Sequence, residues 1–316
     1  MKPALHVSRI IDKVSLAASM AFSLEPLVTP KPGNVHRLGD VKDLKLEYFT
    51  MASPLLLPLF RRASKVGIEF LKYNIISKGI IGKIVYDCSL KIKRWFRTNI
   101  GLGAVLTLTV QSIASSMSLL EDPAFSLKTL SRNVGRVIRT TTVEDTTWYY
   151  KSIKLFTPGY LGRLCYLGYP DVNSPFYNTI LLRNNISLHK LLQILSLDLV
   201  SKNLASNLEC TIKYFTFFNR VYCEFKDWNY ALVVTYLKIL SENIDYLVFR
   251  RHGIETAKLV MLQSKKLLDE ILNVENWRSK VLRFDLKLRR EGINPGSTAD
   301  IITSVIMVAL MKGIKP

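Results

Sequence analysis

The chain has 316 residues, of which 48% are hydrophobic and 22% charged, and its formal net charge is +19. This composition supports a sizeable core and excludes an intrinsically disordered or fibrous protein. The excess of Lys and Arg favours an anionic partner, namely a phosphorylated small molecule, a nucleic acid or an acidic lipid surface, although the same charge also serves solubility.

The first expected element is an amphipathic helix over residues 7–24. Its apolar positions recur at helical spacing: Val7, Ile10, Val14, Ala17, Ala21 and Leu24. Cations precede an uncharged run here, as in a secretion signal, but Asp12 lies among them. We therefore expect a core helix of a cytoplasmic protein.

Residues 25–49 form a loop rich in charged and amide groups. Pro30 and Pro32 stiffen the backbone on either side of Lys31. Gly33 permits a backbone conformation that other residues avoid. The polar side chains that follow are Asn34, His36, Arg37, Asp40, Asp43 and Glu47. Cations beside carboxylates in a rigid loop suit a magnesium-bound polyphosphate, and a charge-balanced surface turn is the simpler alternative.

Residues 98–120 carry no charge and are long enough to cross a bilayer. Hydroxyl and amide side chains recur along the stretch, which favours a buried helix of a globular protein and no membrane span. Asn99, Gly101 and Gly103 lie at its start, a weak signal for a phosphate-binding loop. Close helix packing explains these glycines equally well.

Helical spacing dominates the rest of the chain. Apolar stripes run through 188–195, 233–247 and 257–271. Thr141 and Glu144 form the pattern of a capping box ahead of another helix. Because no convincing strand or linker is found, we expect an all-α fold in which residues 1–316 form a single multi-helix globular domain.

The segment INPGSTAD, residues 293–300, introduces the last expected helix. Ser297 is positioned to be its N-cap, the helix then runs to about Lys312, and Gly313 ends it. Free backbone N–H groups at such a helix start can bind an anion. An ordinary capping turn is the alternative, and Asp300 in the first helical turn is favourable in both cases.

The cysteines and histidines indicate what the protein lacks. Cys88, Cys165, Cys210 and Cys223 form no CxxC pair, and the four histidines do not cluster with them. We therefore expect neither a zinc site nor a disulfide framework. Reduced thiols agree with a cytoplasmic location.

Five segments resemble, in order and spacing, the signatures of the triphosphoribosyl-dephospho-CoA synthase family. They are PKPGNVHR at 30–37 with Glu25 ahead of it, TNIG at 98–101, the Glu-Asp stretch and following Pro-Gly within 141–162, DYLVFRRHG at 245–253, and NPGSTAD at 294–300. The first and last are the most specific. Two positions depart from the pattern, because Arg97 replaces an expected Asn and His36 stands where citrate-lyase-associated members usually carry Asp. These departures bear on the identity of the substrates.

The resemblance implies a mostly helical enzyme that breaks the N-glycosidic bond of ATP and releases adenine. The triphosphoribosyl unit passes to the ribose 2′-hydroxyl of 3′-dephospho-CoA, which yields the precursor of a prosthetic group. Such a transfer passes through an oxocarbenium-like sugar that carboxylates stabilise, and the acceptor hydroxyl needs a base. ATP, 3′-dephospho-CoA or a related phosphorylated acceptor, and Mg²⁺ are the expected ligands.

The resemblance also implies which residues form the site. Those expected to bind phosphates or to orient ribose are Lys31, Gly33, Asn34, His36, Arg37, Asn99, Gly101, Arg250, Arg251, Asn294, Gly296, Ser297 and Thr298. Those expected to be catalytic are Asp43, Glu144, Asp145, Asp245 and Asp300, with Asp171 as an addition. The expected Mg²⁺ ligands are Asp43, Asp145 and Asp300. A solvated helix end for Arg250 and Arg251, and a salt bridge for Asp245, are the simpler alternatives.

Two other functions stay open at this point. One is a relative that keeps the nucleotide site but uses another acceptor or phosphoribosyl donor, which the two departures motivate. The other is a basic protein that binds nucleic acid, which the net charge suggests, or a membrane surface, since Lys91, Lys93, Arg94 and Arg97 lie near Trp95 and Phe96. No helix-turn-helix, zinc-finger or aromatic–basic strand motif is present, so we expect no nucleic-acid partner. We also expect no membrane partner. The sequence leaves the oligomeric state open.

Overall fold

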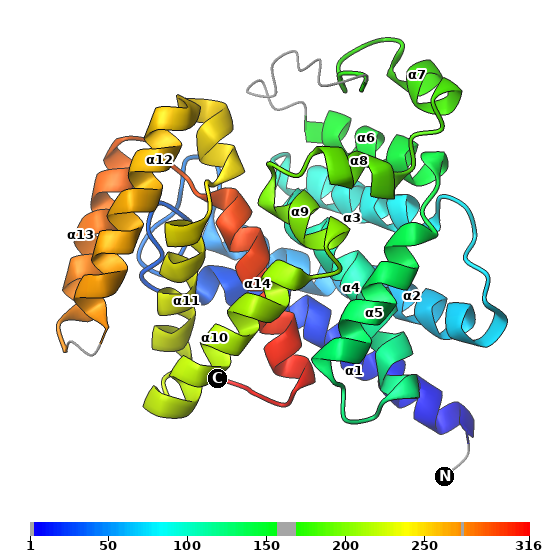
Figure 1. Ribbon diagram of the computed structural model, residues 1–316, viewed down its shortest axis with the longest axis horizontal. Helices are drawn as coiled ribbons and strands as arrows, with labels where there is room; N and C mark the ends of the chain where they lie inside the picture. The colour runs from blue at the N-terminus through cyan, green and yellow to red at the C-terminus, as the bar shows by residue number, and fades with distance from the viewer. Residues whose placement is uncertain (1–2, 157–168, 273–274) are drawn as a thin grey trace.

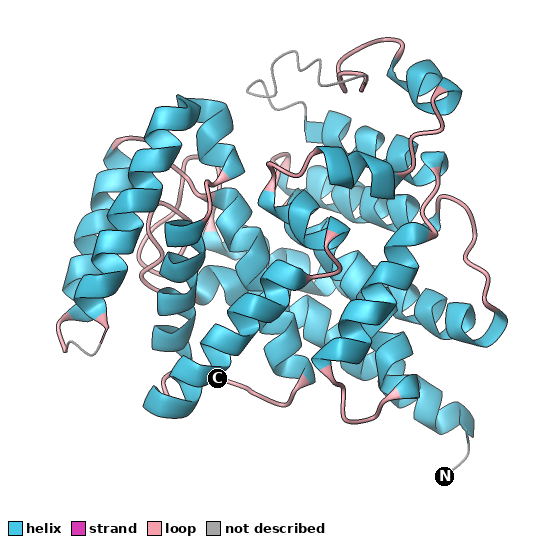
Figure 2. Ribbon diagram, viewed as in Figure 1, coloured by secondary structure: helices cyan, strands magenta, loops and turns pink. Residues whose placement is uncertain are grey.

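The computed structural model describes residues 3–156, 169–272 and 275–316. Helices joined by loops make up this part of the chain (Figure 1, Figure 2). The α-helices are α1 (Pro3–Leu24), α2 (Leu46–Tyr73), α3 (Ile80–Phe96), α4 (Leu102–Glu121), α5 (Leu127–Arg139), α6 (Val143–Phe156), α7 (Tyr177–Arg183), α8 (Leu188–Ile194), α9 (Leu199–Ala205), α10 (Glu209–Phe225), α11 (Trp228–Glu242), α12 (Tyr246–Ile271), α13 (Trp277–Arg290) and α14 (Gly296–Met311), and the short 3-10 helix η1 (Glu25–Leu27) follows α1. Within the described residues, the strand-like pairings are isolated bridges between His36 and Gly39 and between Val41 and Leu44. The predicted all-α fold is confirmed.

Two helices, α4 and α14, form the centre of the molecule (Figure 1). Each carries one acidic residue and no cation, so all of its faces can be buried against other helices. In the described part of the chain, α4 alone is long and apolar enough to cross a membrane, yet it is almost entirely buried in the protein. The prediction of a buried helix is therefore confirmed for residues 102–120, whereas residues 98–101 precede the helix.

The remaining helices surround this centre. The pair α1 and α2 packs together, and α2 contacts α4, while α10 and α11 contact α14. Ile10, Val14, Ala17 and Ala21 are buried, as the helical spacing of α1 predicts. The helices α12 and α13 form a hairpin at one edge of the molecule, and α6, α7 and α8 lie at the opposite side (Figure 1).

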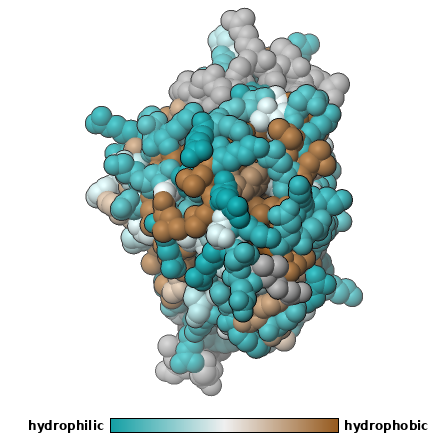
Figure 3. Space-filling view, turned by 90° about the vertical axis from the view of Figure 1, so that its left-hand side faces the viewer, coloured by the Kyte–Doolittle hydropathy of each residue, from teal (hydrophilic) through white to brown (hydrophobic). Residues whose placement is uncertain are grey.

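The outer side of the molecule near α12 and α13 is largely hydrophilic, with hydrophobic groups interspersed (Figure 3). Leu259, Leu262 and Leu286 are among the exposed apolar side chains of these two helices. Helix α12 changes direction at Gly253, whose φ of 83° is left-handed and which lies inside the helix bounds. The short first part of α12 is thereby separated from the long part that pairs with α13.

The predicted capping box lies one residue later than expected. Helix α6 begins at Val143, and Asp145 Oδ2 accepts the backbone N–H of Thr142 at 2.8 Å. The Thr141 hydroxyl instead donates to the carbonyl of Ile138 at 2.7 Å, at the end of the preceding helix. The prediction that Thr141 and Glu144 form the box is therefore wrong, because Thr141 is used by the turn that ends α5.

The start of the last helix also differs from the prediction. Helix α14 begins at Gly296, so Ser297 lies inside the first turn and is not the N-cap. The N–H of Thr298 is bound by Asp245 at 2.8 Å, which means that a distant carboxylate caps this helix. The end agrees with the prediction, since Gly313 follows it with a φ of 81°.

The apolar stripe over residues 233–247 belongs to two helices. Helix α11 ends at Glu242, and Asp245 caps α12 by accepting the N–H groups of Leu247 at 3.0 Å and Val248 at 3.1 Å. Val233, Leu237 and Leu240 of α11 are buried, and Ile244 and Leu247 are half-buried, so the apolar spacing continues across the turn and does not reveal the break.

Candidate active site

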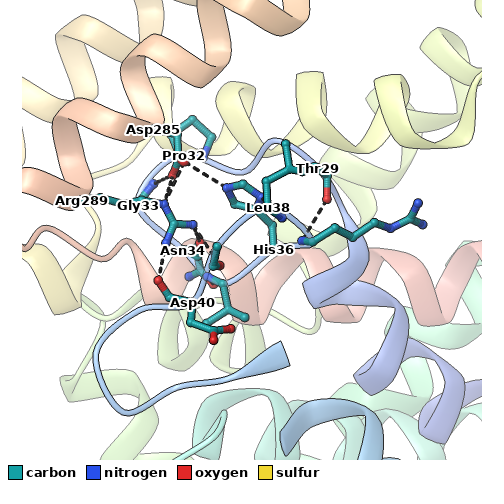
Figure 4. Close-up of polar contacts among 12 residues, drawn as sticks. Thr29, Pro32, Gly33, Asn34, His36, Leu38, Asp40, Asp285 and Arg289 are labelled. Atoms are coloured by element: carbon teal, nitrogen blue, oxygen red, sulfur yellow. Dashed lines mark hydrogen bonds and ion pairs between the residues drawn. The ribbon is translucent and has the colours of Figure 1, made fainter. Parts of the chain in front are cut away.

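One acidic and one basic residue of α13 hold the loop that contains PKPGNVHR (Figure 4). Asp285 Oδ1 accepts the N–H of Gly33 at 2.9 Å, and Asp285 Oδ2 lies 3.0 Å from His36 Nε2. Arg289 Nε donates to both oxygens of Asp285 at 2.8 Å. A terminal nitrogen of Arg289 donates to the carbonyl of Asn34 at 2.6 Å. These charge-assisted bonds fix the backbone of the loop.

The pKa of Asp285 agrees with the hydrogen bonds that it makes to His36 and Arg289. Burial by itself raises the pKa of Asp285, but the hydrogen bonds from His36 and Arg289 outweigh it and bring the pKa below its ordinary value. Asp285 is therefore charged at neutral pH. His36 turns toward α13, so the departure from the family pattern at this position affects the anchoring of the loop.

The first and last motifs, far apart in the sequence, meet at Gly33 and Asn34. Gly33 has a φ of 71°, and a Cβ atom there would lie 2.5 Å from the carbonyl oxygen of Ile293, so this position requires glycine. Asn34 Nδ2 donates to Asn294 Oδ1 at 3.0 Å. Both asparagines are buried, and their contact joins the two most specific motifs into one structural unit.

A cavity of about 510 Å³ lies beside this unit, a volume typical of small-molecule sites. The expected site residues that line it are Asn34, Asp43, Asn99, Gly101, Asp171, Arg250, Arg251, Asn294, Gly296, Ser297 and Asp300. All five motif segments contribute, because Tyr149 and Phe156 of α6 also belong to the lining. The fold therefore gathers segments from the whole length of the chain around one cavity.

Three carboxyl groups of the lining, on Glu25, Asp198 and Asp300, interact electrostatically. Asp300 Oδ1 accepts the N–H of Ala104 at 3.0 Å, at the start of α4. Burial, followed by the charges of Asp198 and Glu25, raises the pKa of Asp300 well above its ordinary value. Burial also raises the pKa of Asp198. Carboxyl groups whose pKa is raised in this way are candidates for proton transfer.

Asp300 is held against the backbone of α4 with no spare space. A Cβ atom on Gly103 would lie 2.2 Å from Asp300 Oδ2. The glycine that the sequence offered as a weak phosphate-loop signal thus permits the close approach of α14 to α4. Gly101, with a φ of 90°, precedes the helix, and Asn99 Oδ1 accepts the N–H of Leu102 at 3.1 Å.

Lys31 is fully buried and is ion-paired with Glu25. Its Nζ also donates to the carbonyl of Glu25 at 3.2 Å. Burial lowers the pKa of Lys31 and raises that of Glu25, and the charge of each partner opposes the shift of the other. Glu25 lines the cavity and Lys31 does not. Lys31 is therefore placed to position Glu25, and it is not placed to contact a phosphate in the cavity.

The lining also contains cations and an apolar wall. Its cations are Lys42, Arg97, Arg250 and Arg251. Its apolar and aromatic side chains include Phe22, Phe49, Tyr149, Ile153, Phe156, Leu191 and Leu195. Arg250 lies over the ring of Tyr246, 5.9 Å from the centroid. Guanidinium groups suit phosphates, and the apolar wall suits the uncharged parts of a nucleotide-like ligand.

Asp145, expected to bind metal, lies away from the cavity lining. Its carboxylate accepts the N–H of Gly82 at 2.9 Å and that of Thr142 at 2.8 Å, which ties the start of α3 to the start of α6. The expected residues Glu144 and Arg37 are exposed and do not line the cavity either. The fold does not bring these three residues together with Asp300.

Asp245 does not line the cavity, and it links the start of α12 to the start of α14. Beside its bonds within α12, Oδ2 accepts both the N–H and the hydroxyl of Thr298 at 2.8 Å. Burial raises the pKa of Asp245 to about 6, although these hydrogen bonds oppose the rise. Its partners are N–H and O–H groups, so the geometry shows a capping role for Asp245 and Thr298.

The lining can hold a magnesium ion only if a polyphosphate supplies further ligands to it. No group of three or more His, Cys, Asp or Glu residues that could hold a metal ion occurs in the described residues. Asp43 and Asp300 do line the cavity. Magnesium bound to phosphates usually takes one or two carboxylates, since phosphate oxygens and water fill its other positions. This donor set is compatible with an ion that arrives with a nucleotide.

Two residues of the site lay outside the sequence prediction. Asp198 was not predicted because its segment contains no motif, and its one signal is a capping pattern with Ser201, whose N–H it accepts at 3.0 Å. Glu25 was noted ahead of the first motif but was not assigned to the site. Cys165 and the Pro-Gly pair at 158–159 lie outside the described residues.

The fold and the cavity define an all-helical protein whose site combines interacting carboxyl groups with guanidinium groups. Residues 11–316 match the family model of the ATP:dephospho-CoA triphosphoribosyl transferases, and the chain belongs to this family. It is accordingly a transferase of the triphosphoribosyl-dephospho-CoA synthase type, and the resemblance of its motifs is confirmed.

A solved structure supports the fold. The crystal structure of a candidate triphosphoribosyl-dephospho-CoA synthase from Archaeoglobus fulgidus is similar, with a TM-score of 0.62 and 22% sequence identity. The match covers 86% of this chain and 100% of that one. A comparison with curated proteins gave no match.

Proposed function

We propose that the cavity is the active site in which the triphosphoribosyl unit of ATP is transferred to 3′-dephospho-CoA. The observation that carries this proposal is the convergence of Glu25, Asp198 and Asp300 on a cavity whose lining also includes Arg250 and Arg251. Carboxyl groups can stabilise the positive charge of the reacting sugar, and guanidinium groups can bind the phosphate chains of both substrates.

The chemistry needs one bond to break and one to form. The C1′–N9 bond of ATP breaks and its electron pair leaves with adenine, which takes up a proton. The ribose develops oxocarbenium character that a nearby carboxylate stabilises. The 2′-oxygen of dephospho-CoA then bonds to C1′ and gives its proton to a base. We assign the proton transfers to Asp300 and its neighbour Asp198, since a carboxyl group with a raised pKa can both give and accept a proton.

Magnesium and the cellular location are part of the same proposal. Mg²⁺ would be held by Asp43 or Asp300 together with phosphate oxygens, and it would neutralise the charge of the triphosphate. A cytoplasmic location is supported by Cys88, Cys210 and Cys223, which form no disulfide among the described residues.

The test is the release of adenine, followed by chromatography, from ATP and Mg²⁺ with and without 3′-dephospho-CoA. We expect adenine only when dephospho-CoA is present, and we expect Asp300→Asn to abolish it. Asn is close to Asp in shape, and its Oδ1 can still accept the N–H of Ala104, so the melting temperature should not fall. Asp269→Asn, at an exposed carboxylate outside the cavity, is the matched control.

Each outcome has a distinct meaning. Full activity of Asp300→Asn would contradict the assigned role of Asp300. Adenine release without dephospho-CoA would mean that water accepts the triphosphoribosyl unit, which would contradict dephospho-CoA as the required acceptor.

A further inference from the structure

Arg97 occupies a backbone position that is unfavourable for arginine. It is the C-cap residue of α3, and its φ of 58° and ψ of 0° lie in the left-handed region. A residue with a Cβ atom loses free energy there, so helices usually end on glycine or asparagine in this conformation. Helix α2 follows that rule, since its C-cap is Asn74 with a φ of 54°. An asparagine at position 97 would therefore suit the backbone better.

The location of Arg97 suggests a function that compensates for its unfavourable backbone conformation. Arg97 is exposed and lines the same cavity as Arg250 and Arg251, whereas its neighbours Lys93 and Arg94 do not. Among the residues that the structure describes, no carboxylate is ion-paired with its guanidinium group. The five N–H donors of an exposed arginine at a cavity are well suited to a phosphate group.

A second cation of the lining shares this feature. Lys42 also has a left-handed backbone, with a φ of 49°, and it also lines the cavity. Lys226 ends α10 with a φ of 53°, but it lies outside the cavity. A substitution of Lys226 therefore reports the effect of the left-handed backbone alone, without any effect on the cavity.

We propose that Arg97 binds a phosphate chain at the cavity and sets the affinity of this protein for one of its two phosphorylated substrates. The phosphate chain is either the triphosphate of ATP or the pyrophosphate of dephospho-CoA, which share the chemistry that a guanidinium group recognises. The inference rests on the proposed function and adds to it a residue that the motif pattern does not predict, because that pattern has asparagine at this position.

The test compares Arg97→Asn with the wild-type protein in two separate measurements. Isothermal titration calorimetry gives the dissociation constants of ATP and of dephospho-CoA, each alone, and adenine release gives kcat and KM. We expect one of the two dissociation constants to rise by about tenfold or more, because a charge-assisted hydrogen bond is lost. The value of kcat should stay within about twofold, because the proposal places Arg97 at a phosphate chain and not at the reacting bond.

The melting temperature tests the alternative that Arg97 has only a structural role, because Arg97→Asn would then melt at a lower temperature than the wild type. Because asparagine tolerates the left-handed conformation, Arg97→Asn should melt at the same temperature as the wild type or higher. Lys226→Asn should behave in the same way in melting and should leave both dissociation constants unchanged. Arg94→Asn, which removes an exposed cation of the same helix outside the cavity, controls for net charge.

The outcomes are separable. If Arg97→Asn binds ATP and dephospho-CoA as tightly as the wild type, the proposal for Arg97 is refuted even when turnover is observed. If the wild type binds both ligands but releases no adenine, the proposed reaction fails, and a weaker binding by Arg97→Asn still supports the phosphate-binding role.

Discussion

Replacement of Lys31 by methionine removes the counter-charge of a buried carboxyl group while it keeps the length of the side chain. The side chains of Lys31 and Glu25 are 0% and 4% exposed, so water cannot replace the lost ammonium group. Truncation of one partner of such a pair costs about 3–5 kcal/mol of unfolding free energy. In a chain of 316 residues that cost lowers the melting temperature by about 5–8 °C.

The assay is thermal and urea unfolding followed by circular dichroism. The double variant Glu25→Leu with Lys31→Met should recover most of the lost stability, because two apolar side chains leave no uncompensated charge. Lys258→Met is the matched control, since its partner Glu255 is 83% exposed and such surface pairs contribute little. A Lys31→Met variant as stable as the wild type would refute the view that this pair is buried and coupled.

The pH dependence gives a further check. Burial raises the pKa of Glu25 in the folded state above its unfolded value. Its contribution to stability is therefore fully present below the unfolded pKa and is lost as the pH rises through the folded value. Without Lys31 this loss should grow, so the deficit of Lys31→Met should be small in acid and large at neutral pH. A deficit that does not change with pH would contradict this explanation.

Two further predictions concern stability. The pKa of Asp245 rises from 3.8 to about 6, so stability should fall by up to about 3 kcal/mol as the pH rises across this interval. In Asp245→Asn, urea unfolding should show that this fall is absent, and an unchanged pH slope would exclude Asp245 as its source. Gly67→Ala should lower the unfolding free energy by about 1–3 kcal/mol, because its Cβ atom would lie 2.1 Å from the carbonyl oxygen of Ile113. An unaltered denaturation midpoint would show that α2 and α4 can separate at little cost.

The helices could be predicted from the sequence because their signals are local. The apolar spacing of α1 and the uncharged length of α4 gave the correct type of element. The ends were less predictable, since a carboxylate from another helix caps α14 through Thr298, and no local pattern contains that information.

The candidate site was predictable only in part, for a related reason. Asp245 and Asp300 both lie in segments that resemble the family and near helix starts, and the sequence offers no basis for separating their roles. Packing separates them, because the oxygens of Asp245 are taken up by N–H and O–H groups of α12 and α14, while Asp300 lines the cavity. Asp198 reaches the same cavity from a segment without any motif.

The sequence by itself determined the helical class, the order of the motifs and the family. Only the tertiary structure decided which charged residues face the cavity, which lie in its walls, and that Lys31 positions Glu25. The physical reason is that helical periodicity is set by residues three and four apart, whereas desolvation and capping of a charge depend on helices that are distant along the chain.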